Sequence, residues 1–284
     1  MFWGAGFILL LVMALALYTL FRAPSQRQPI SANAFIIAGG VAFPIVTLTA
    51  LLIYGVDAMR SLRAADEQPA QIEVVGNRWW WDVHYRNADG HIVTSANEVR
   101  IPAGKPVKVL VRTNDVIHSF WVPNLAGKID LIPGRTNHIV LQANAPGQFR
   151  GQCAEFCGAQ HARMAFYVIA ETPEAHAAWL AHQQKPAATP ADQLSLRGRD
   201  VFVSKCAQCH TVRGVAEAGK RAPDLTHLAS RQFIAAGTLE NNRENLIAFV
   251  SRSQEIKPGN AMPSQSDLDD ATLQALASYL ESLK

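Results

Sequence analysis

The sequence predicts a multidomain membrane protein built from a two-helix transmembrane hairpin, an all-β domain and a small all-α domain. Three observations support this prediction. The first 56 residues are almost free of charge, residues 71–170 alternate short apolar stretches with turn residues, and the last 90 residues show helical apolar spacing. A formal net charge of +3, without a dense Lys/Arg block, argues against a nucleic-acid partner.

Two apolar runs near the N-terminus qualify as membrane helices. Residues 1–21 contain no charged side chain, and a second uncharged run covers residues 30–56. Both runs reach the length of about 20 residues that a helix needs to cross the hydrocarbon core. The link between them holds Arg22 and Arg27 and no acid, so the positive-inside rule places it in the cytoplasm. Everything after residue 56 is then expected on the periplasmic side.

For the first run, the alternative is a cleaved signal peptide. In such a peptide the positive charge precedes the apolar stretch, whereas here the arginine follows it, so we favour a retained helix. In the second run, Pro44 removes a helical hydrogen bond and is expected to kink the helix, and Gly39 and Gly40 allow close approach of another helix. These residues suggest a larger membrane partner.

The pattern after the membrane segments predicts three further parts. Stretches such as IEVVG, VKVLVR and MAFYVIA, separated by turn signals such as NADG and PAGKP, predict a β-sandwich or small barrel. A short helix is expected over residues 174–182, and the Pro- and Ala-rich stretch after it is typical of a linker. The predicted domains are a hairpin over 1–65, a β domain over 66–182, a linker over 183–193 and a helical domain over 194–284.

The four cysteines form two close pairs. Cys153 and Cys157 are separated by three residues, and Cys206 and Cys209 by two, with His210 directly after them. Such spacing suits a metal or cofactor better than a disulfide framework. Two local disulfides in an exported protein are the alternative.

The segment CAQCH is a c-type haem attachment motif. The thiols of Cys206 and Cys209 would add to the two vinyl groups of haem, and His210 would reach the iron from one face. The motif lies on a predicted helix, and a thioredoxin-like dithiol would need a βαβ pattern that is not visible. Met262, 52 residues after His210, is the only methionine beyond the motif and is the preferred sixth ligand, with His227 as the alternative.

A second cluster gathers soft donors. The stretch GQCAEFCGAQHARM supplies Cys153, Cys157, His161 and Met164 within twelve residues, and NDVIHSF adds His118 at the end of a predicted strand. Two thiolates, two imidazoles and a thioether favour copper over hard cations, and the second thiolate indicates a dinuclear centre. A zinc site with two cysteines and two histidines is the alternative, but it gives Met164 no role.

Three long stretches, GNRWWWDVHY, NDVIHSFWVPNLAGKIDLIPGRTN and GQCAEFCGAQHARM, resemble subunit II of cytochrome c oxidases. With the two preceding helices this similarity covers about residues 1–180. Residues 194–284 resemble small bacterial class I cytochromes c, through PDLTHLASR and the MP dipeptide before the last helix. The order of the parts is similar to that of caa-type oxidases, which carry a fused cytochrome c.

The resemblance implies a cupredoxin fold for residues 71–170 and a dinuclear copper A centre within it. The implied ligands are two bridging thiolates, one imidazole for each copper, a weak thioether and a weak backbone carbonyl, and they come from Cys153, Cys157, His118, His161, Met164 and Glu155. In the family, the carboxylate of this glutamate also reaches a magnesium site shared with subunit I.

Two further positions match functional residues of the family. Trp79, the first tryptophan of the WWW run, matches the residue through which electrons enter, although sheet packing would explain an aromatic residue here equally well. Asp115 matches an acid near the docking surface for cytochrome c. One departure concerns the second helix, where ISANAFIIAGGVAFP lacks the glutamate that many members carry. The resemblance therefore does not extend to proton uptake through this subunit.

These observations predict the electron-transfer subunit of a proton-pumping cytochrome c oxidase. Electrons would pass from a haem c to copper A and then to the haem-copper site of subunit I, which reduces oxygen to water. The expected partners are subunit I, subunit III, the lipid bilayer and a cytochrome c or other periplasmic donor, and the expected location is the bacterial inner membrane with both cofactor domains on the periplasmic side. The alternatives are a nitric or nitrous oxide reductase component and a free electron carrier or copper-delivery protein.

Overall fold

The computed structural model divides into two compact units, Met1–Ser61 and Leu62–Lys284. It describes residues 2–23, 31–66, 70–86, 90 and 92–284, with the backbone alone for 61–66. Arg27, one of the two arginines used above to orient the hairpin, lies outside the described residues.

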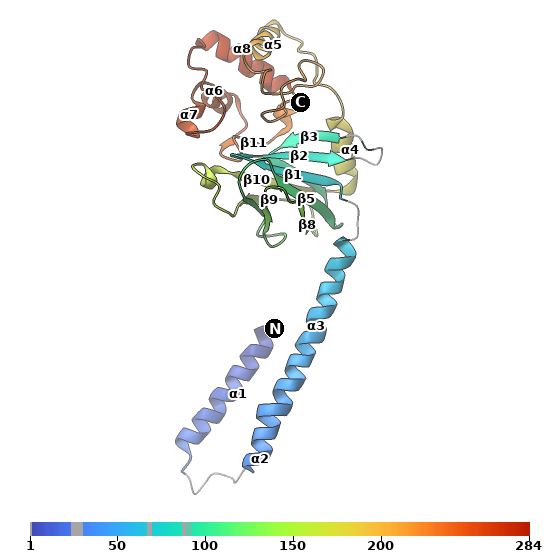
Figure 1. The fold of residues 1–284 in the computed structure, drawn as a ribbon, viewed down its shortest axis with the longest axis vertical. Coiled ribbons are helices and arrows are strands. Elements are labelled where there is room, and N and C mark those ends of the chain that lie inside the picture. Colours follow the sequence, from blue (N-terminus) through green and yellow to red (C-terminus); the bar gives the residue numbers. More distant parts are fainter. Residues whose placement is uncertain (1, 24–30, 67–69, 87–89, 91) are drawn as a thin grey trace. The chain divides into compact units, whose positions relative to one another are not determined.

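The first unit holds two antiparallel helical rods (Figure 1). One is α1 (Phe2–Phe21), and the other is a continuous run of α2 (Ala32–Phe35), the π-helix η2 (Ile36–Ala42) and α3 (Phe43–Asp66). The stretches Phe2–Phe21 and Ala32–Arg60 are long and apolar enough to cross a membrane, and no part of their most apolar windows is buried in the protein. The two predicted membrane segments are thus present as helices of the required length and composition.

The second rod has a widened turn directly before Pro44. At the end of η2 the Phe43 N–H donates to the Ala38 carbonyl, five residues back instead of the four of an α-helix. Pro44 has no N–H, so an α-helical ladder would be broken at this point in any case. The disturbance that the sequence predicts at Pro44 takes the form of this π-helical segment, which contains Gly39 and Gly40.

The described part of the second unit begins with a β-sandwich of two five-stranded sheets, in the orders β3-β2-β1-β5-β8 and β4-β10-β9-β6-β7. The strands are β1 (Ile72–Asn77), β2 (Trp80–Arg86), β3 (Ile92–Ala96), β4 (Glu98–Pro102), β5 (Val107–Thr113), β6 (His118–Trp121), β7 (Ile129–Leu131), β8 (Asn137–Leu141), β9 (Gly147–Cys153) and β10 (Ala165–Glu171). This arrangement confirms the predicted cupredoxin-like domain.

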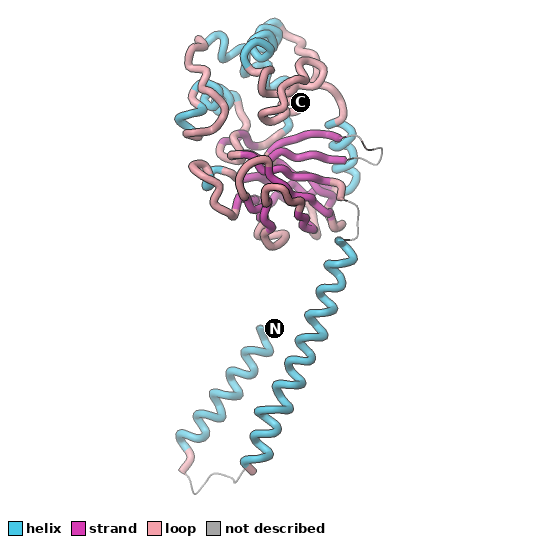
Figure 2. Tube along the Cα trace, viewed as in Figure 1, coloured by secondary structure: helices cyan, strands magenta, loops and turns pink. Residues whose placement is uncertain are grey.

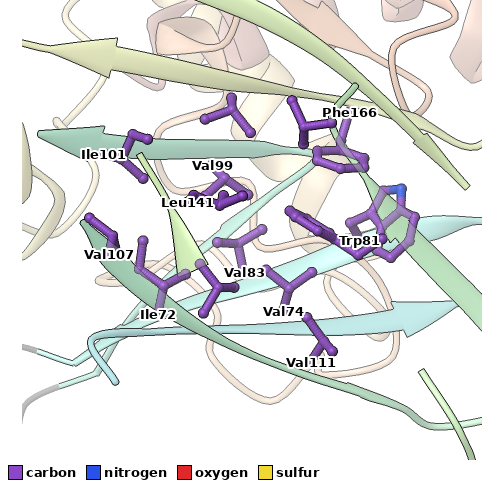
Figure 3. Packing of buried hydrophobic residues seen from close by; sticks show 14 of the residues in the cluster. Ile72, Val74, Trp81, Val83, Val99, Ile101, Val107, Val111, Leu141 and Phe166 are labelled. Atoms are coloured by element: carbon purple, nitrogen blue, oxygen red, sulfur yellow. The ribbon is translucent and has the colours of Figure 1, made fainter. Parts of the chain in front are cut away.

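The core of the sandwich lies between the two sheets (Figure 3). Strand β5 shows the alternation that makes it, because Val107, Val109 and Val111 are buried while the residues between them are half-buried. Trp81 and Phe166 meet edge to face at 5.1 Å between ring centroids. Full burial of each such side chain contributes about 1.5–3 kcal/mol, so this layer supplies the rigidity on which the loops at its edge depend.

The rest of the second unit is mostly helical, and Figure 2 shows the strands and the C-terminal helices in separate regions. Its elements are the 3₁₀ turn η3 (His161–Arg163) and α4 (Pro173–Gln183), then α5 (Gln193–Lys205), the 3₁₀ turn η4 (Leu228–Ser230), the short β11 (Phe233–Ile234) and β12 (Leu239–Glu240), α6 (Arg243–Ser251), α7 (Ser253–Ile256) and α8 (Asp270–Ser282). We refer to residues 72–183 as the β region and to residues 193–284 as the helical region. Each has its own cluster of buried apolar side chains, and that of the helical region includes Phe202, Leu276 and Tyr279.

Polar side chains cap the starts of three helices. The side chains of Thr172, Asp192 and Asp269 accept hydrogen bonds from the backbone N–H three residues on, at the starts of α4, α5 and α8. The predicted linker after α4 is held in place: Ala187 N donates to the Arg213 carbonyl at 3.0 Å. The predicted domain boundaries themselves stay predictions.

Gly198 allows α5 and α8 to cross in contact. A Cβ built on Gly198 would lie 1.9 Å from the carbonyl oxygen of Ala275 and 2.8 Å from Cβ of Tyr279. No side chain fits in that space, because both neighbours belong to a buried helix.

We therefore expect Gly198→Ala to force the two helices apart and to lower the unfolding free energy of the helical region by about 1–3 kcal/mol. Thermal unfolding followed by circular dichroism would measure the change. Gly127→Ala is the control, since a Cβ at Gly127 meets nothing within 4 Å. Equal midpoints for the two variants would show that α5 and α8 separate without cost.

Candidate metal and haem centres

One loop carries four of the five soft side-chain donors. Cys153 is the last residue of β9, Met164 directly precedes β10, and the Cys153 N–H donates to the Met164 carbonyl at 3.0 Å. Cys157 lies within the loop, and His161 opens the 3₁₀ turn η3. The strand pair thus closes the loop at its base and brings its two ends together.

The fifth donor, His118, comes from the neighbouring strand. It is the first residue of β6, not the end of a strand as the sequence suggested, and β6 pairs with β9 through Phe120 opposite Cys153. A Cβ on Gly76 would lie 2.8 Å from Cδ2 of His118, so the bare glycine leaves room for the imidazole. His118 is fully buried at this position.

The donor atoms lie in one connected cluster around the two thiols, which we call the donor ring. The two thiol sulfurs are 3.7 Å apart, Nδ1 of His118 is 3.8 Å from Cys153 Sγ, and Nδ1 of His161 is 3.7 Å from Cys157 Sγ. Sδ of Met164 lies 3.8 Å from Cys157 Sγ, and the Glu155 carbonyl oxygen 3.2 Å from Cys153 Sγ. A sulfur–sulfur separation of 3.7 Å is far beyond the disulfide bond length of about 2.05 Å, and all four cysteines are free thiols.

Hydrogen bonds fix which nitrogen of His118 faces the sulfurs. Its Nε2 lies 2.8 Å from a carboxylate oxygen of Asp115, so this nitrogen carries the proton and Nδ1 keeps its lone pair toward Cys153. Asp115 also accepts from the backbone N–H groups of Arg78 and Val116, each at 2.7 Å. Burial alone would raise the pKa of Asp115, but these hydrogen bonds lower it, so the carboxylate stays charged. This role is not visible in the sequence, where the resemblance associates Asp115 with docking.

The two thiols share one negative charge before any metal binds. The hydrogen bond from Cys157 lowers the pKa of Cys153. The contact with Cys153 raises the pKa of Cys157, because a second thiolate would lie beside the first. A cation at this position removes that repulsion, so binding should release protons.

Trp79 is linked to the same loop. It lies in the turn between β1 and β2, and its indole Nε1 donates to the Cys157 carbonyl at 2.9 Å. Its side chain belongs to the core cluster of the β region and is 9% exposed. Trp79 thus packs in the core and also contacts the loop that carries the donors, and its role in electron entry stays a prediction.

The haem attachment motif follows a helix instead of lying on it. Helix α5 ends at Lys205, and Cys206 is its C-cap, with its N–H donating to the Phe202 carbonyl at 2.8 Å. The chain then turns, and the His210 N–H donates back to the Cys206 carbonyl at 3.0 Å. Both motif cysteines are half-buried free thiols.

His210 is oriented as an axial ligand of haem iron needs to be. Its Nδ1 donates to the Pro223 carbonyl at 2.8 Å, which leaves the lone pair on Nε2. Burial lowers the pKa of His210, which favours the neutral imidazole that binds a metal. These features fit the group that the motif predicts.

The two candidates for the sixth ligand differ clearly. Met262 lies in the loop before α8, packs against the core of the helical region, and its N–H donates to Asn260 Oδ1 at 2.6 Å. His227 has Nδ1 2.7 Å from the Lys284 carbonyl and Nε2 3.1 Å from the Lys185 carbonyl. Both imidazole nitrogens already face carbonyl oxygens, which leaves Met262 as the better candidate.

Comparison with known proteins identifies the family. Residues 85–171 match the family model described as cytochrome c oxidase subunit II, periplasmic domain, and residues 195–284 match cytochrome c. The chain is 35% identical to cytochrome c oxidase subunit 2 of Alkalihalophilus pseudofirmus, over 96% of this chain and 82% of that protein. The chain belongs to the cytochrome c oxidase subunit 2 family.

Further relatives carry the same description. Subunit 2 of Bacillus subtilis is 31% identical over 90% of this chain and 77% of that protein. Among solved structures, the periplasmic domain of subunit II of cytochrome oxidase from Bradyrhizobium japonicum is 31% identical, with a TM-score of 0.38, over 41% of this chain and 96% of that chain. Membership of the oxidase subunit 2 family makes the chain one component of an enzyme with further subunits, and its two matched domains imply copper and haem.

Because Asp115 holds the His118 ring, we expect Asp115→Ala to weaken copper binding by about 10- to 100-fold. Titration of the copper-free chain against a competing chelator would measure this affinity. Glu174→Ala, an exposed acid of the β region, is the matched control. An unchanged affinity in Asp115→Ala would mean that core packing alone orients His118.

Proposed function

We propose that the chain is the electron-accepting subunit of a respiratory cytochrome c oxidase. Electrons would arrive at a covalent haem c, pass to a dinuclear copper A centre and leave for the haem-copper site of subunit I. There oxygen would be reduced to water, with proton pumping. The observation that carries this proposal is the donor ring, with two thiols 3.7 Å apart and an imidazole nitrogen beside each. A mononuclear site would need only one of these thiols.

The residues of the ring fit two coppers. Cys153 and Cys157 would bridge them, with His118 on one metal and His161 on the other. Met164 and the Glu155 carbonyl would be weak ligands, one for each metal. The zinc alternative uses only the cysteines and histidines, whereas Met164 is fully buried with its sulfur 3.8 Å from Cys157 Sγ.

The helical region would hold the haem. Cys206 and Cys209 would bind it covalently, and His210 and Met262 would be its axial ligands. A thioether opposite an imidazole raises the reduction potential of haem iron and suits electron transfer. Burial lowers the pKa of His210, and the hydrogen bond to the Pro223 carbonyl orients its ring.

Trp79 is the residue through which electrons would reach the copper loop, because its indole is hydrogen-bonded to the Cys157 carbonyl. The Glu155 side chain is 45% exposed and its carboxylate lies 3.9 Å from the ammonium group of Lys128, so a magnesium ion held jointly with subunit I would replace this exposed ion pair. The proposed partners also include subunit III and a periplasmic donor such as cytochrome c. The proposed location is the bacterial inner membrane.

Metal and haem analysis of the intact chain tests this proposal. We expect two coppers and one haem for each chain, with an electron paramagnetic resonance signal shared over both coppers. Cys157→Ser should abolish the shared signal, since one thiolate cannot bridge the pair as two do. The purified complex should consume oxygen and not nitrogen oxides.

Three outcomes would contradict it. Fewer than two coppers for each haem, or a colourless domain loaded with zinc, would remove the copper centre. If the purified complex reduced nitric or nitrous oxide, the chain would be assigned to a different reductase. If the chain purified without a catalytic subunit, it would be assigned as a free electron carrier.

The ligand assignment in the helical region makes a separate prediction. Met262→Leu should remove the thioether, lower the reduction potential of the haem and abolish the weak absorption band of sulfur-ligated haem iron. His227→Gln should leave both properties unchanged, because both ring nitrogens of His227 already face backbone carbonyls. The reverse pattern, measured by visible spectroscopy and redox titration, would assign the iron to His227.

A further inference from the structure

Lys257 is a buried charge at the boundary between the helical region and the β region. It follows α7 directly and is 3% exposed. Its ammonium group donates to the carbonyls of Trp79 at 2.9 Å, Arg163 at 3.0 Å and Ala235 at 3.1 Å. A lysine has three N–H donors, so all of them are used.

The three carbonyls come from segments far apart in the sequence. Trp79 belongs to the β1–β2 turn, Arg163 to the loop of residues 154–164 between β9 and β10 (the donor loop), and Ala235 to the turn between β11 and β12. The Lys257 side chain, which belongs to the helical region, thus joins the β1–β2 turn and the donor loop of the β region to a turn of the helical region. Burial, followed by the nearby positive charge of Arg163, lowers the pKa of Lys257 to about 7.

Two alanines take an unfavourable backbone conformation at the same boundary. Ala235 and Ala236 have φ of 54° and 58°, in the left-handed region that costs an alanine about 1–2 kcal/mol. The Ala235 carbonyl accepts from Lys257, and the Ala236 carbonyl accepts from the N–H of Ala165, across the boundary, at 3.1 Å. These hydrogen bonds account for the strained turn.

The chain from Ile256 to Gly259 lies on the donor loop and on Trp79. The Pro258 carbonyl accepts from Gln160 Nε2 at 2.7 Å, and the Ile256 carbonyl accepts from the Arg163 guanidinium. A Cβ built on Gly259, where φ is 79°, would lie 4.0 Å from Cη2 of Trp79. The same short loop continues to Met262.

A second patch makes the boundary extensive. The buried carboxylate of Glu98 accepts from the N–H of Gln232 at 2.6 Å, and the rings of Tyr167 and Phe233 stack with centroids 4.2 Å apart. Buried charges satisfied from both sides are costly to separate, since each would be left unpaired. The helical region is therefore held against the β region and does not simply hang on its linker.

We propose that Lys257 is a positioning residue for electron transfer, which fixes the loop carrying Met262 against Trp79 and so keeps the cytochrome portion of the chain seated at the donor ring. This inference rests on the proposed function for the roles of Met262 and Trp79. Lys257 and the three carbonyls that it donates to form a clamp, which contains only groups of the described chain. The clamp can therefore be tested without cofactors.

The test replaces Lys257 with methionine in the full chain and follows amide hydrogen exchange. The substitution leaves three buried carbonyls without their donor, so we expect exchange at residues 257–262 to become at least about tenfold faster. Lys220→Met, an exposed lysine of the helical region, is the matched control and should exchange like the parent chain. Gln160→Ala removes one neighbouring contact and should give a smaller change in the same residues.

A second measurement is the rate of electron transfer from haem to copper after a light pulse. Lys257→Met should slow this step while the spectra of both centres stay unchanged, since no ligand is altered. Parent-like exchange and an unchanged rate in Lys257→Met would overturn the proposal. Failure of the proposed function is distinguishable, because it would appear in the parent chain as missing copper or haem, whereas hydrogen exchange reports on the clamp in either case.

Discussion

The pairing of β9 with β6 and β10 is the constraint on which the donor ring depends. Cys153 closes the loop through its hydrogen bond to the Met164 carbonyl, and the same strand aligns Cys153 beside the strand that starts at His118. Side chains alternate across a strand, so a shift of one residue in this register would turn Cys153 away from the other donors. The aromatic core formed by Trp81, Phe120 and Phe166 lies directly behind these strands and holds them in register.

The helical region solves a similar problem with less regular structure. Between α5 and α8 its chain runs mostly in turns, and backbone carbonyls do much of the orienting there. Pro223 orients His210, and Lys284 and Lys185 occupy His227. Gly198 allows α5 and α8 to pack directly on each other, which gives these turns a rigid support.

The sequence points to the candidate donor residues more clearly than to the groups that surround them. The soft donors on one loop and the CAQCH segment can be recognised from residue type and spacing alone. Cys153, Cys157 and His210 could therefore be found without a structure. Asp115 and Lys257 could not, because their partners lie in segments that only the fold brings together. The place of His118 at the start of β6, and of Cys206 after α5, shows the usual uncertainty of element ends.

The burial of Trp79 has a kinetic consequence. Trp79 has 9% of its surface exposed, and a loop of the helical region lies against its ring. The indole therefore has too little accessible surface to form the contact site for a diffusing redox protein. If electrons cross at Trp79, the only bimolecular collision in the route takes place at the outer surface of residues 193–284. Ionic strength would then act on that collision alone, and the onward steps inside the chain would proceed at first-order rates independent of salt and of donor concentration.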